Sequence, residues 1–289
     1  MARAFSSRRI HFGVNDMKSI SEISGATRLY AIIADPIIQV KTPQVINALF
    51  EQVGHEGVMV PFHVTANGLP AVIAGLRSLA NLEGFIVTVP HKTAMLSLCD
   101  QVTAHAQQVG AVNVVRRSPG GELIGDILDG IGFVAGLRQE GFEPAGASVY
   151  LAGAGGAANA IAFALAEAGV AQLTVANRTA AKAEALLARL RAAFPTLPLH
   201  LGNADPSGHA LVVNATSLGL RAGDPLPCDT SRLCADQWVA EIIMQPARTP
   251  LLLGAAARGC RIQEGLPMLL CQARLMARAM GAPAPEGAA

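Results

Sequence analysis

The stretch YLAGAGGAANAIAFALAEAG contains a glycine-rich turn whose residue types suit the binding of a dinucleotide. A predicted strand precedes the turn and a predicted helix follows it, and Gly153, Gly155 and Ala158 give the pattern G-x-G-x-x-A. Glycines let the backbone approach a pyrophosphate closely, and the free N–H groups of the first helical turn face its charge. A tightly packed turn that binds nothing is the alternative. The residues predicted to bind the phosphates are Gly153, Ala154, Gly155, Gly156 and Ala157.

The end of the next predicted strand indicates which dinucleotide binds. In NAD-binding versions of this unit, an acidic residue about 20 positions after the glycines takes the ribose 2′-hydroxyl. Here the strand runs into Asn177, Arg178 and Thr179, with Lys182 one turn later. A carboxylate would repel a 2′-phosphate, whereas a guanidinium pairs with it through two hydrogen bonds. The sequence therefore predicts NADP as the cofactor, and a surface arginine at a helix start is the alternative.

A further polar cluster follows a later apolar strand, in VVNATSLGL. Open parallel sheets bind their ligands outside the carboxyl ends of the strands. We therefore expect Asn214, Thr216 and Ser217 on the nicotinamide side of the cofactor cleft.

The elements that must position these residues alternate between short apolar strands and amphipathic helices. Strands are expected at 28–35, 57–64, 84–89, 147–153, 171–178, 197–202, 210–216 and 238–244, and helices at 42–54, 69–80, 91–100, 104–110, 156–169 and 180–194. Residues 111–118 and 122–128, joined by a Pro-Gly-Gly turn, indicate a hairpin-like pair. Such alternation is typical of an α/β fold with parallel sheets covered by helices on both faces.

Composition narrows the function classes. A chain of 289 residues suggests two domains, and the net charge of +1 without a basic stripe argues against nucleic acid or an anionic membrane as partner. No apolar run reaches the ~18 residues of a membrane span. The 5 cysteines form no C-x-x-C and the 7 histidines show no paired ligand spacing. We therefore expect no disulfide framework and no metal site, which fits a reducing cytoplasm.

The apolar stretch GFIVTVPHK ends on Lys92, and this position is unusual for a lysine. Lysines are rarely buried, so a solvated charge at the end of a strand is the ordinary explanation. His91, which precedes it, is likewise expected to touch solvent.

Several stretches, in order between about Arg28 and Met280, resemble the shikimate dehydrogenase family: DPIIQVKTP, VTVPHK, GAVN, DGIG, GAGGAA, NRTAAK, NATSLG, QPARTPLL and GLPMLLCQ. The resemblance implies an N-terminal α/β substrate domain at 25–128 and a Rossmann-type, doubly wound parallel-sheet NADP domain at 129–261. It also implies that a C-terminal helix at 262–281 packs back on the first domain. Residues 1–24 are then an N-terminal extension.

The resemblance also implies the reaction and the residues that carry it. Lys92 and Asp129 match the family's catalytic pair. Hydride transfer from a ring alcohol to nicotinamide requires loss of the hydroxyl proton, which a lysine can exchange while a carboxylate orients it. The expected reaction interconverts a ring alcohol and ketone of a cyclic hydroxy acid, shikimate or a less polar relative, in a cytoplasmic monomer or homodimer. A purely structural salt bridge is the alternative for the pair.

The substrate positions of the family are only partly kept. Thr88, Asn113 and Gln272 match polar pocket residues of the family, whereas Val40 and Thr42 replace two serines that grip a carboxylate. Four further positions that are polar in the family are apolar here: Ile86, Ile127, Leu128 and Met244. Each lost hydrogen bond to a charged group costs about 1.5–3 kcal/mol. The changes therefore predict weak use of shikimate and a less polar substrate.

Two alternatives stay open at this point. One is a quinate-type dehydrogenase, and the other is a non-catalytic NADP-binding sensor or partner subunit. Glu241 resembles a family acid near the domain junction, and satisfying backbone groups there is its plainer role. The apolar stripe of Met268, Leu269, Leu275 and Met276 is interpreted as core packing.

Overall fold

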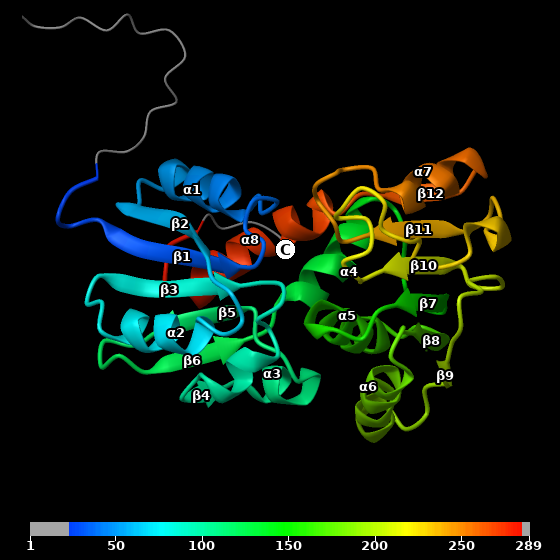
Figure 1. Ribbon diagram of the computed structural model, residues 1–289, viewed down its shortest axis with the longest axis horizontal. Coiled ribbons are helices and arrows are strands. Elements are labelled where there is room, and N and C mark those ends of the chain that lie inside the picture. The colour runs from blue at the N-terminus through cyan, green and yellow to red at the C-terminus, as the bar shows by residue number, and fades with distance from the viewer. Residues whose placement is uncertain (1–22, 285–289) are drawn as a thin grey trace, which may run out of the picture.

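The structure, a computed structural model, describes residues 23–284 and contains two six-stranded sheets flanked by helices (Figure 1). The N-terminal extension expected at 1–24 lies outside the described residues, apart from its last two. The first sheet is formed by the first half of the chain and the second sheet by the second half. The α/β fold expected from the sequence is confirmed.

The first sheet has the strand order β2-β1-β3-β5-β6-β4. Its strands β2, β1 and β3 are parallel, but β5 runs antiparallel to both β3 and β6. The expected hairpin-like pair is thus confirmed, and it makes this sheet mixed rather than parallel. The elements are β1 (Arg28–Ala34), α1 (Thr42–Gln52), β2 (Gly57–His63), α2 (Leu69–Arg77), β3 (Leu82–Val87), η1 (Ala94–Ser97), β4 (Gln101–Val102), α3 (Ala104–Val109), β5 (Val114–Arg117) and β6 (Leu123–Asp126).

The second sheet has the order β12-β11-β10-β7-β8-β9, and all of its neighbouring strands are parallel. This is the doubly wound order of Rossmann folds, in which ligands bind where the order reverses, here between β7 and β10. The elements are β7 (Ser148–Ala152), α5 (Gly156–Glu167), β8 (Gln172–Ala176), α6 (Ala180–Ala193), β9 (Leu199–Leu201), β10 (Leu211–Asn214), η2 (Thr230–Arg232), β11 (Trp238–Glu241), α7 (Pro250–Ala257) and β12 (Arg261–Gln263).

The central strands of each sheet are buried on both faces. Consecutive side chains of β1 enter different cores: Ala31 and Ile33 pack with α2, whereas Tyr30 and Ile32 pack with α1 and α8. This alternation is the period of two of a strand, and burial on both sides explains the uninterrupted apolar run. The largest core joins residues of both sheets, so the two halves of the chain pack against each other continuously.

Helices α4 (Asp129–Gln139) and α8 (Leu266–Ala279) connect the two halves (Figure 1). Helix α4 packs against α5 and α8, and α8 also contacts α1 and β5. Two glycines of α4 allow this close approach. A Cβ atom at Gly130 would lie 2.2 Å from the carbonyl oxygen of Ala160, and one at Gly132 would lie 2.7 Å from the Cβ atom of Gln272.

The helix expected at 91–100 is mostly absent, and only a 3-10 turn forms at Ala94–Ser97. The carbonyl of Lys92 accepts a hydrogen bond from the N–H of Val112, which lies far along the chain, rather than from a residue of the same segment. At the other end, the N–H of Asp100 bonds to the carbonyl of Leu123. Some local hydrogen bonds remain, such as the one from the N–H of Met95 to the carbonyl of His91, but the tertiary bonds at both ends of the segment interrupt a regular helix.

Candidate active site

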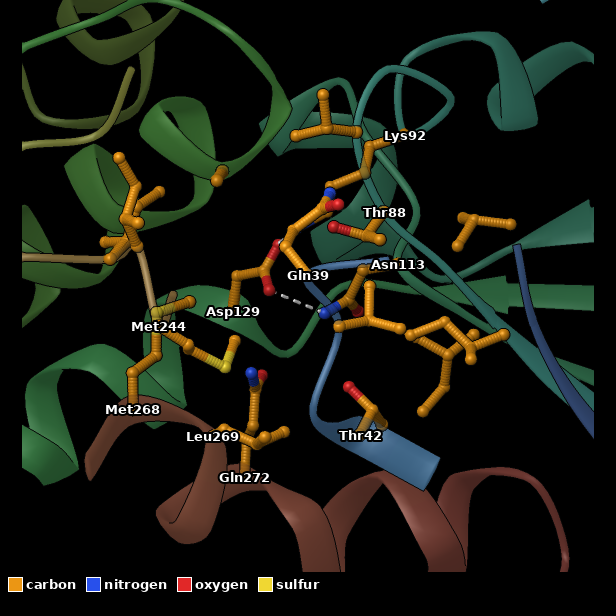
Figure 2. A pocket seen from close by; sticks show the side chains of 18 of the residues that line it. Gln39, Thr42, Thr88, Lys92, Asn113, Asp129, Met244, Met268, Leu269 and Gln272 are labelled. Carbon is orange, nitrogen blue, oxygen red and sulfur yellow. Dashed lines mark hydrogen bonds and ion pairs between the residues drawn. The ribbon is translucent and has the colours of Figure 1, made fainter. Parts of the chain in front are cut away.

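A pocket lies between the two halves of the molecule and is lined by residues of both (Figure 2). Its empty space is about 850 Å³, part of which opens to solvent. The first half contributes residues of β1 and β3 and of the segments that follow them, and the second half contributes the loops after β10 and β11. Helix α8 closes one side, and Met268, Leu269 and Gln272 project from it into the pocket (Figure 2).

Lys92 and Asp129 meet in this pocket. The Nζ atom of Lys92 lies 2.5 Å from the Oδ2 atom of Asp129, although the residues are 37 positions apart. Lys92 is 8% exposed and Asp129 is 2% exposed. A lysine this deeply buried requires a paired charge. Asp129 begins α4, where the helix dipole favours a negative charge.

Asn113 fixes the orientation of the carboxylate (Figure 2). Its Nδ2 atom donates to the Oδ1 atom of Asp129 at 2.9 Å, and its Oδ1 atom accepts from the N–H of Leu128 at 2.9 Å. Because Oδ2 is paired with Lys92 and Oδ1 with Asn113, both oxygens of the carboxylate are held. The arrangement suits an amine that exchanges a proton while the carboxylate stays in place.

His91 supports the backbone beside Lys92. Its side chain is 1% exposed, and its Nε2 atom lies 2.8 Å from the carbonyl oxygen of Val64. The expectation that His91 touches solvent is therefore wrong. The chain folds back after β3, which carries the ring into the core rather than outward.

The substrate residues expected from the sequence all line the pocket: Val40, Thr42, Thr88, Asn113 and Gln272. Two of the apolar replacements, Ile86 and Met244, line it as well. Ile127 and Leu128 do not line it, since both are buried in the cores next to the site. The prediction that these two residues change the pocket is therefore corrected.

Other residues line the pocket although the sequence did not predict them as pocket residues. Gln39 lines the pocket, and nothing in its sequence context distinguishes it from a loop residue. Met268, Leu269 and Met276 are buried as expected for core residues, but they also form one wall of the pocket. A helix that faces two buried surfaces gives the same apolar stripe as one that faces a single core.

The glycine-rich turn follows β7 at the point where the strand order reverses. Gly153 has a φ of +120°, and a Cβ atom there would lie 2.7 Å from the carbonyl oxygen of Ala215, in the loop after β10. Gly155 precedes α5, is exposed, and has open space where a side chain would start. No described side chain caps the N-terminus of α5, so its first N–H groups have no side-chain acceptor at the helix start. The turn fits a dinucleotide phosphate.

Gly156 brings this turn against the catalytic candidate. A Cβ atom at Gly156 would lie 2.7 Å from the Cβ atom of Lys92. Both Ala154 and Ala157 are buried, but only Ala157, the residue after Gly156, lines the pocket. The backbone of the phosphate-binding turn at Gly156 therefore contacts the side-chain stem of Lys92.

The residues predicted to choose between NADP and NAD lie together after β8. Arg178, Thr179 and Lys182 are exposed, and neither Arg178 nor Lys182 forms an ion pair with any residue of the described range 23–284. The Nδ2 atom of Asn177 donates to the carbonyl of Thr179 and shapes the turn. The two free positive charges fit a 2′-phosphate.

A buried network holds the loop after β10. Glu241 is 0% exposed and accepts four hydrogen bonds, from Asn214, Thr249 and the N–H groups of Ile242 and Ile243, at 2.9–3.2 Å. The side chain of Asn214 is therefore buried, its polar atoms are hydrogen-bonded within the protein, and it is not exposed in the cofactor cleft.

The same network places the tip of this loop in the pocket. The Oδ1 atom of Asn214 accepts from both the N–H and the hydroxyl of Thr216. Thr216 and Ser217 line the pocket. Glu241 thus positions Thr216 indirectly, because it holds Asn214 in place.

Replacing Glu241 by glutamine is expected to lower the free energy of unfolding by about 1–3 kcal/mol, because an amide would present donors to groups that are themselves donors. Burial raises the pKa of Glu241 above its ordinary value of 4.5. Ionisation of Glu241 then costs more free energy in the folded protein than in the unfolded chain, so stability falls as pH rises above 4.5. The wild type is expected to lose stability over this range relative to the variant, as urea titrations at several pH values would show.

The control is Glu264→Gln, which removes an acid from an exposed ion pair with Arg248. This change is expected to shift stability little and without the same pH dependence. A Glu241→Gln protein as stable as the wild type would contradict the role assigned to the network.

Neither a metal site nor a membrane-spanning helix is found within residues 23–284. No cluster of three or more histidine, cysteine or acidic side chains there is arranged to hold a metal ion. No helix within this range is both long and apolar enough to cross a membrane.

Comparisons with known proteins show which family the chain is similar to. The model of the shikimate dehydrogenase substrate binding domain matches residues 32–115, and that of shikimate/quinate 5-dehydrogenase matches residues 137–216. A shikimate dehydrogenase (NADP(+)) of Geobacter metallireducens is 38% identical over 259 residues, which cover 87% of this chain and 90% of the relative.

Two solved structures illustrate the range of similar proteins. The shikimate 5-dehydrogenase of Thermus thermophilus, in complex with NADP(H) and shikimate, has a TM-score of 0.77 at 31% identity, covering 90% of this chain and 95% of that one. The 5-ketofructose reductase of a Gluconobacter species has a TM-score of 0.76 at 32% identity, with the same shares covered.

Proposed function

Since the chain belongs to the shikimate dehydrogenase family, we propose that it is an NADP-dependent oxidoreductase that interconverts a ring alcohol and its ketone. The observation that carries the proposal is the buried pair of Lys92 and Asp129, in a pocket that the glycine-rich turn adjoins. NADP supplies the hydride acceptor, or the donor in the reverse direction, when it is bound.

The protein's own residues perform the proton transfer in this proposal. Lys92 takes the proton of the substrate hydroxyl during oxidation and returns it during reduction. Asp129 holds the ammonium group in place, and Asn113 holds Asp129. Thr88 and Gln272 lie within the same pocket and orient the ring through hydrogen bonds.

The cofactor residues lie at the carboxyl edge of the second sheet, in and next to the three loops that follow β7, β8 and β10. The residues from Gly153 to Ala157 hold the pyrophosphate, and Arg178 and Lys182 pair with the 2′-phosphate, next to Asn177 and Thr179. Thr216 and Ser217 lie toward the nicotinamide, and Asn214 holds them there.

The substrate is a ring alcohol less polar than shikimate. Val40, Ile86 and Met244 line the pocket, and none of their side chains can donate a hydrogen bond to a substrate. A protein of similar fold is named a 5-ketofructose reductase. This name supports the view that the same fold can serve more than one substrate. The quinate-type and non-catalytic alternatives are not favoured, because the curated relatives are named NADP-dependent shikimate dehydrogenases. The monomeric or dimeric state and the cytoplasmic location stay predictions.

Steady-state assays of the purified chain test this function. The assays compare NADP+ with NAD+, and shikimate with quinate and apolar cyclic alcohols. We expect turnover with NADP+ and a higher kcat/KM for an apolar ring alcohol than for shikimate. Failure to oxidise any ring alcohol would contradict the proposed activity, and a low KM for shikimate would contradict only the change of substrate.

A further inference from the structure

We propose that Gln39 is a specificity-determining residue that recognises a second hydroxyl group of the substrate through its side-chain amide oxygen. The substrate is then a ring alcohol with at least two hydroxyl groups. One of them is oxidised beside Lys92, and another donates a hydrogen bond to Gln39. This inference rests on the proposed function and adds to it a recognition residue and the substrate group that this residue binds.

The loop between β1 and α1 carries Gln39 into the pocket. A turn closes within this loop, because the N–H of Val40 donates to the carbonyl of Ile37 at 3.1 Å. The two residues inside the turn differ in their surroundings: Ile38 is 92% exposed, whereas Gln39 lines the pocket (Figure 2). The loop therefore presents the amide, and not the neighbouring isoleucine, to a ligand.

The orientation of the Gln39 amide is determined by the contact of its nitrogen. The Nε2 atom donates to the carbonyl oxygen of Pro36 at 2.6 Å. A carbonyl oxygen only accepts hydrogen bonds, so the opposite orientation of the amide would bring two oxygens together. The NH2 group is thus held toward Pro36, and the Oε1 atom is the end of the amide that is left for a ligand.

This oxygen is buried and unused. The Oε1 atom of Gln39 accepts no hydrogen bond from any residue in the range 23–284. Buried polar atoms are normally paired, and an unpaired one costs about 1–3 kcal/mol. A ligand that donates a hydrogen bond to this atom removes the cost, whereas a ligand without a donor there keeps it.

The other polar groups of the pocket are less selective than this oxygen. Gln272 also has an unpaired Oε1 atom, but no hydrogen bond within the described residues holds its amide in one orientation. Hydroxyl groups can donate or accept, and the pocket is lined by those of Thr42, Thr88, Thr216 and Ser217. The Gln39 oxygen can only accept, so it discriminates between a hydroxyl group and a hydrogen atom at one ring position.

The test measures how the effect of removing a substrate hydroxyl depends on Gln39. Shikimate is compared with the two analogues that each lack one of its hydroxyl groups not oxidised in the reaction. Binding is measured by calorimetry on the full chain saturated with NADPH, with which an alcohol does not react. For one of the two analogues, we expect the wild type to bind at least about tenfold more weakly than it binds shikimate, a loss of one hydrogen bond.

Gln39→Met keeps the length of the side chain but removes the acceptor. We expect this variant to bind shikimate and the same analogue with affinities within about twofold of each other, because neither ligand then has a partner at this position. A purely structural role of Gln39 would instead weaken all three ligands by the same factor. An unchanged tenfold discrimination in the folded variant would overturn the inference, and so would a wild type that binds none of the three ligands.

Two further variants complete the test. Gln44→Met makes the same substitution at an exposed position of α1 outside this pocket, and it is expected to keep the discrimination of the wild type. Gln39→Asn, whose shorter side chain withdraws the oxygen, replaces the methionine variant if that protein does not fold. It is expected to lose the discrimination as well, and retention of it would count against the inference.

These outcomes separate the inference from the proposed function. If the discrimination depends on Gln39 but the chain oxidises no ring alcohol with NADP+, the proposed oxidoreductase activity fails and the hydroxyl recognition stands. If ring alcohols are oxidised but the discrimination is the same without Gln39, the activity stands and the inference fails.

Discussion

Replacing Lys92 by methionine is expected to lower kcat by about 10²–10⁴-fold with every accepted substrate, because the hydroxyl proton then has no acceptor. NADP+ binding is expected to stay near the wild-type value, since Lys92 contacts the glycine-rich turn only through its stem. Initial rates of NADPH formation and equilibrium titration with NADP+ measure the two effects separately.

Methionine at this position leaves the Asp129 carboxylate buried without its partner, which destabilises a protein by several kcal/mol. Lys92→Arg separates stability from chemistry. Arginine keeps the charge and the ion pair, but its guanidinium does not release a proton near neutral pH. We expect the arginine variant to fold and still to lose most of its turnover.

Lys41→Met is the matched control, because this lysine lies outside the pocket lining. It is expected to keep normal turnover. Undiminished oxidation by both Lys92 variants would rule out the proton-transfer role and would reopen the non-catalytic alternative.

Replacing Arg178 by glutamate is expected to lower kcat/KM for NADP+ by at least about 100-fold. The variant loses two charge-assisted hydrogen bonds of about 1.5–3 kcal/mol each, and each 1.4 kcal/mol corresponds to a factor of ten. The new carboxylate also repels the 2′-phosphate and suits a ribose 2′-hydroxyl. The preference for NADP+ over NAD+ therefore falls and is expected to reverse.

Binding of 2′,5′-ADP and of 5′-ADP to the variant gives a readout that does not depend on turnover. We expect only the former to weaken strongly. Arg191→Glu makes the same charge change at the exposed far end of α6 and serves as the control. If both ADP ligands weaken equally, Arg178 does not read the 2′-phosphate.

The pocket combines a retained reaction centre with an altered recognition surface. One continuous set of contacts crosses the two sheets. It joins the Lys92–Asp129 pair and Asn113 to the loops after β7 and β10. The apolar replacements that line the pocket, Val40, Ile86 and Met244, are not among the residues hydrogen-bonded to the pair. Substitutions at these positions can therefore change the substrate while the proton-transfer geometry stays intact.

The sequence by itself was sufficient for features that depend on local chemistry. The period of two or of 3.6 residues follows from backbone geometry, so most strands and most helices could be predicted. The two-residue strand at Gln101–Val102 was not expected, and the strand at Arg261–Gln263 overlaps the start of the helix expected at 262–281. The glycine-rich turn and the absence of an acid after the next strand also act locally, through backbone access and charge. These two features were enough to predict a dinucleotide site and its preference for NADP.

Only the tertiary structure decided which side chains meet. Lys92 and Asp129 converge because β3 and β6 end at the same edge of the sheet, and no local pattern encodes this. Ile127 faces a core and Gln39 faces the pocket for the same reason. The helix expected at 91–100 is mostly absent, and the carbonyl of Lys92 accepts its hydrogen bond from the distant N–H group of Val112. A residue's neighbours in space depend on the packing of whole elements, whereas its propensity depends only on adjacent residues.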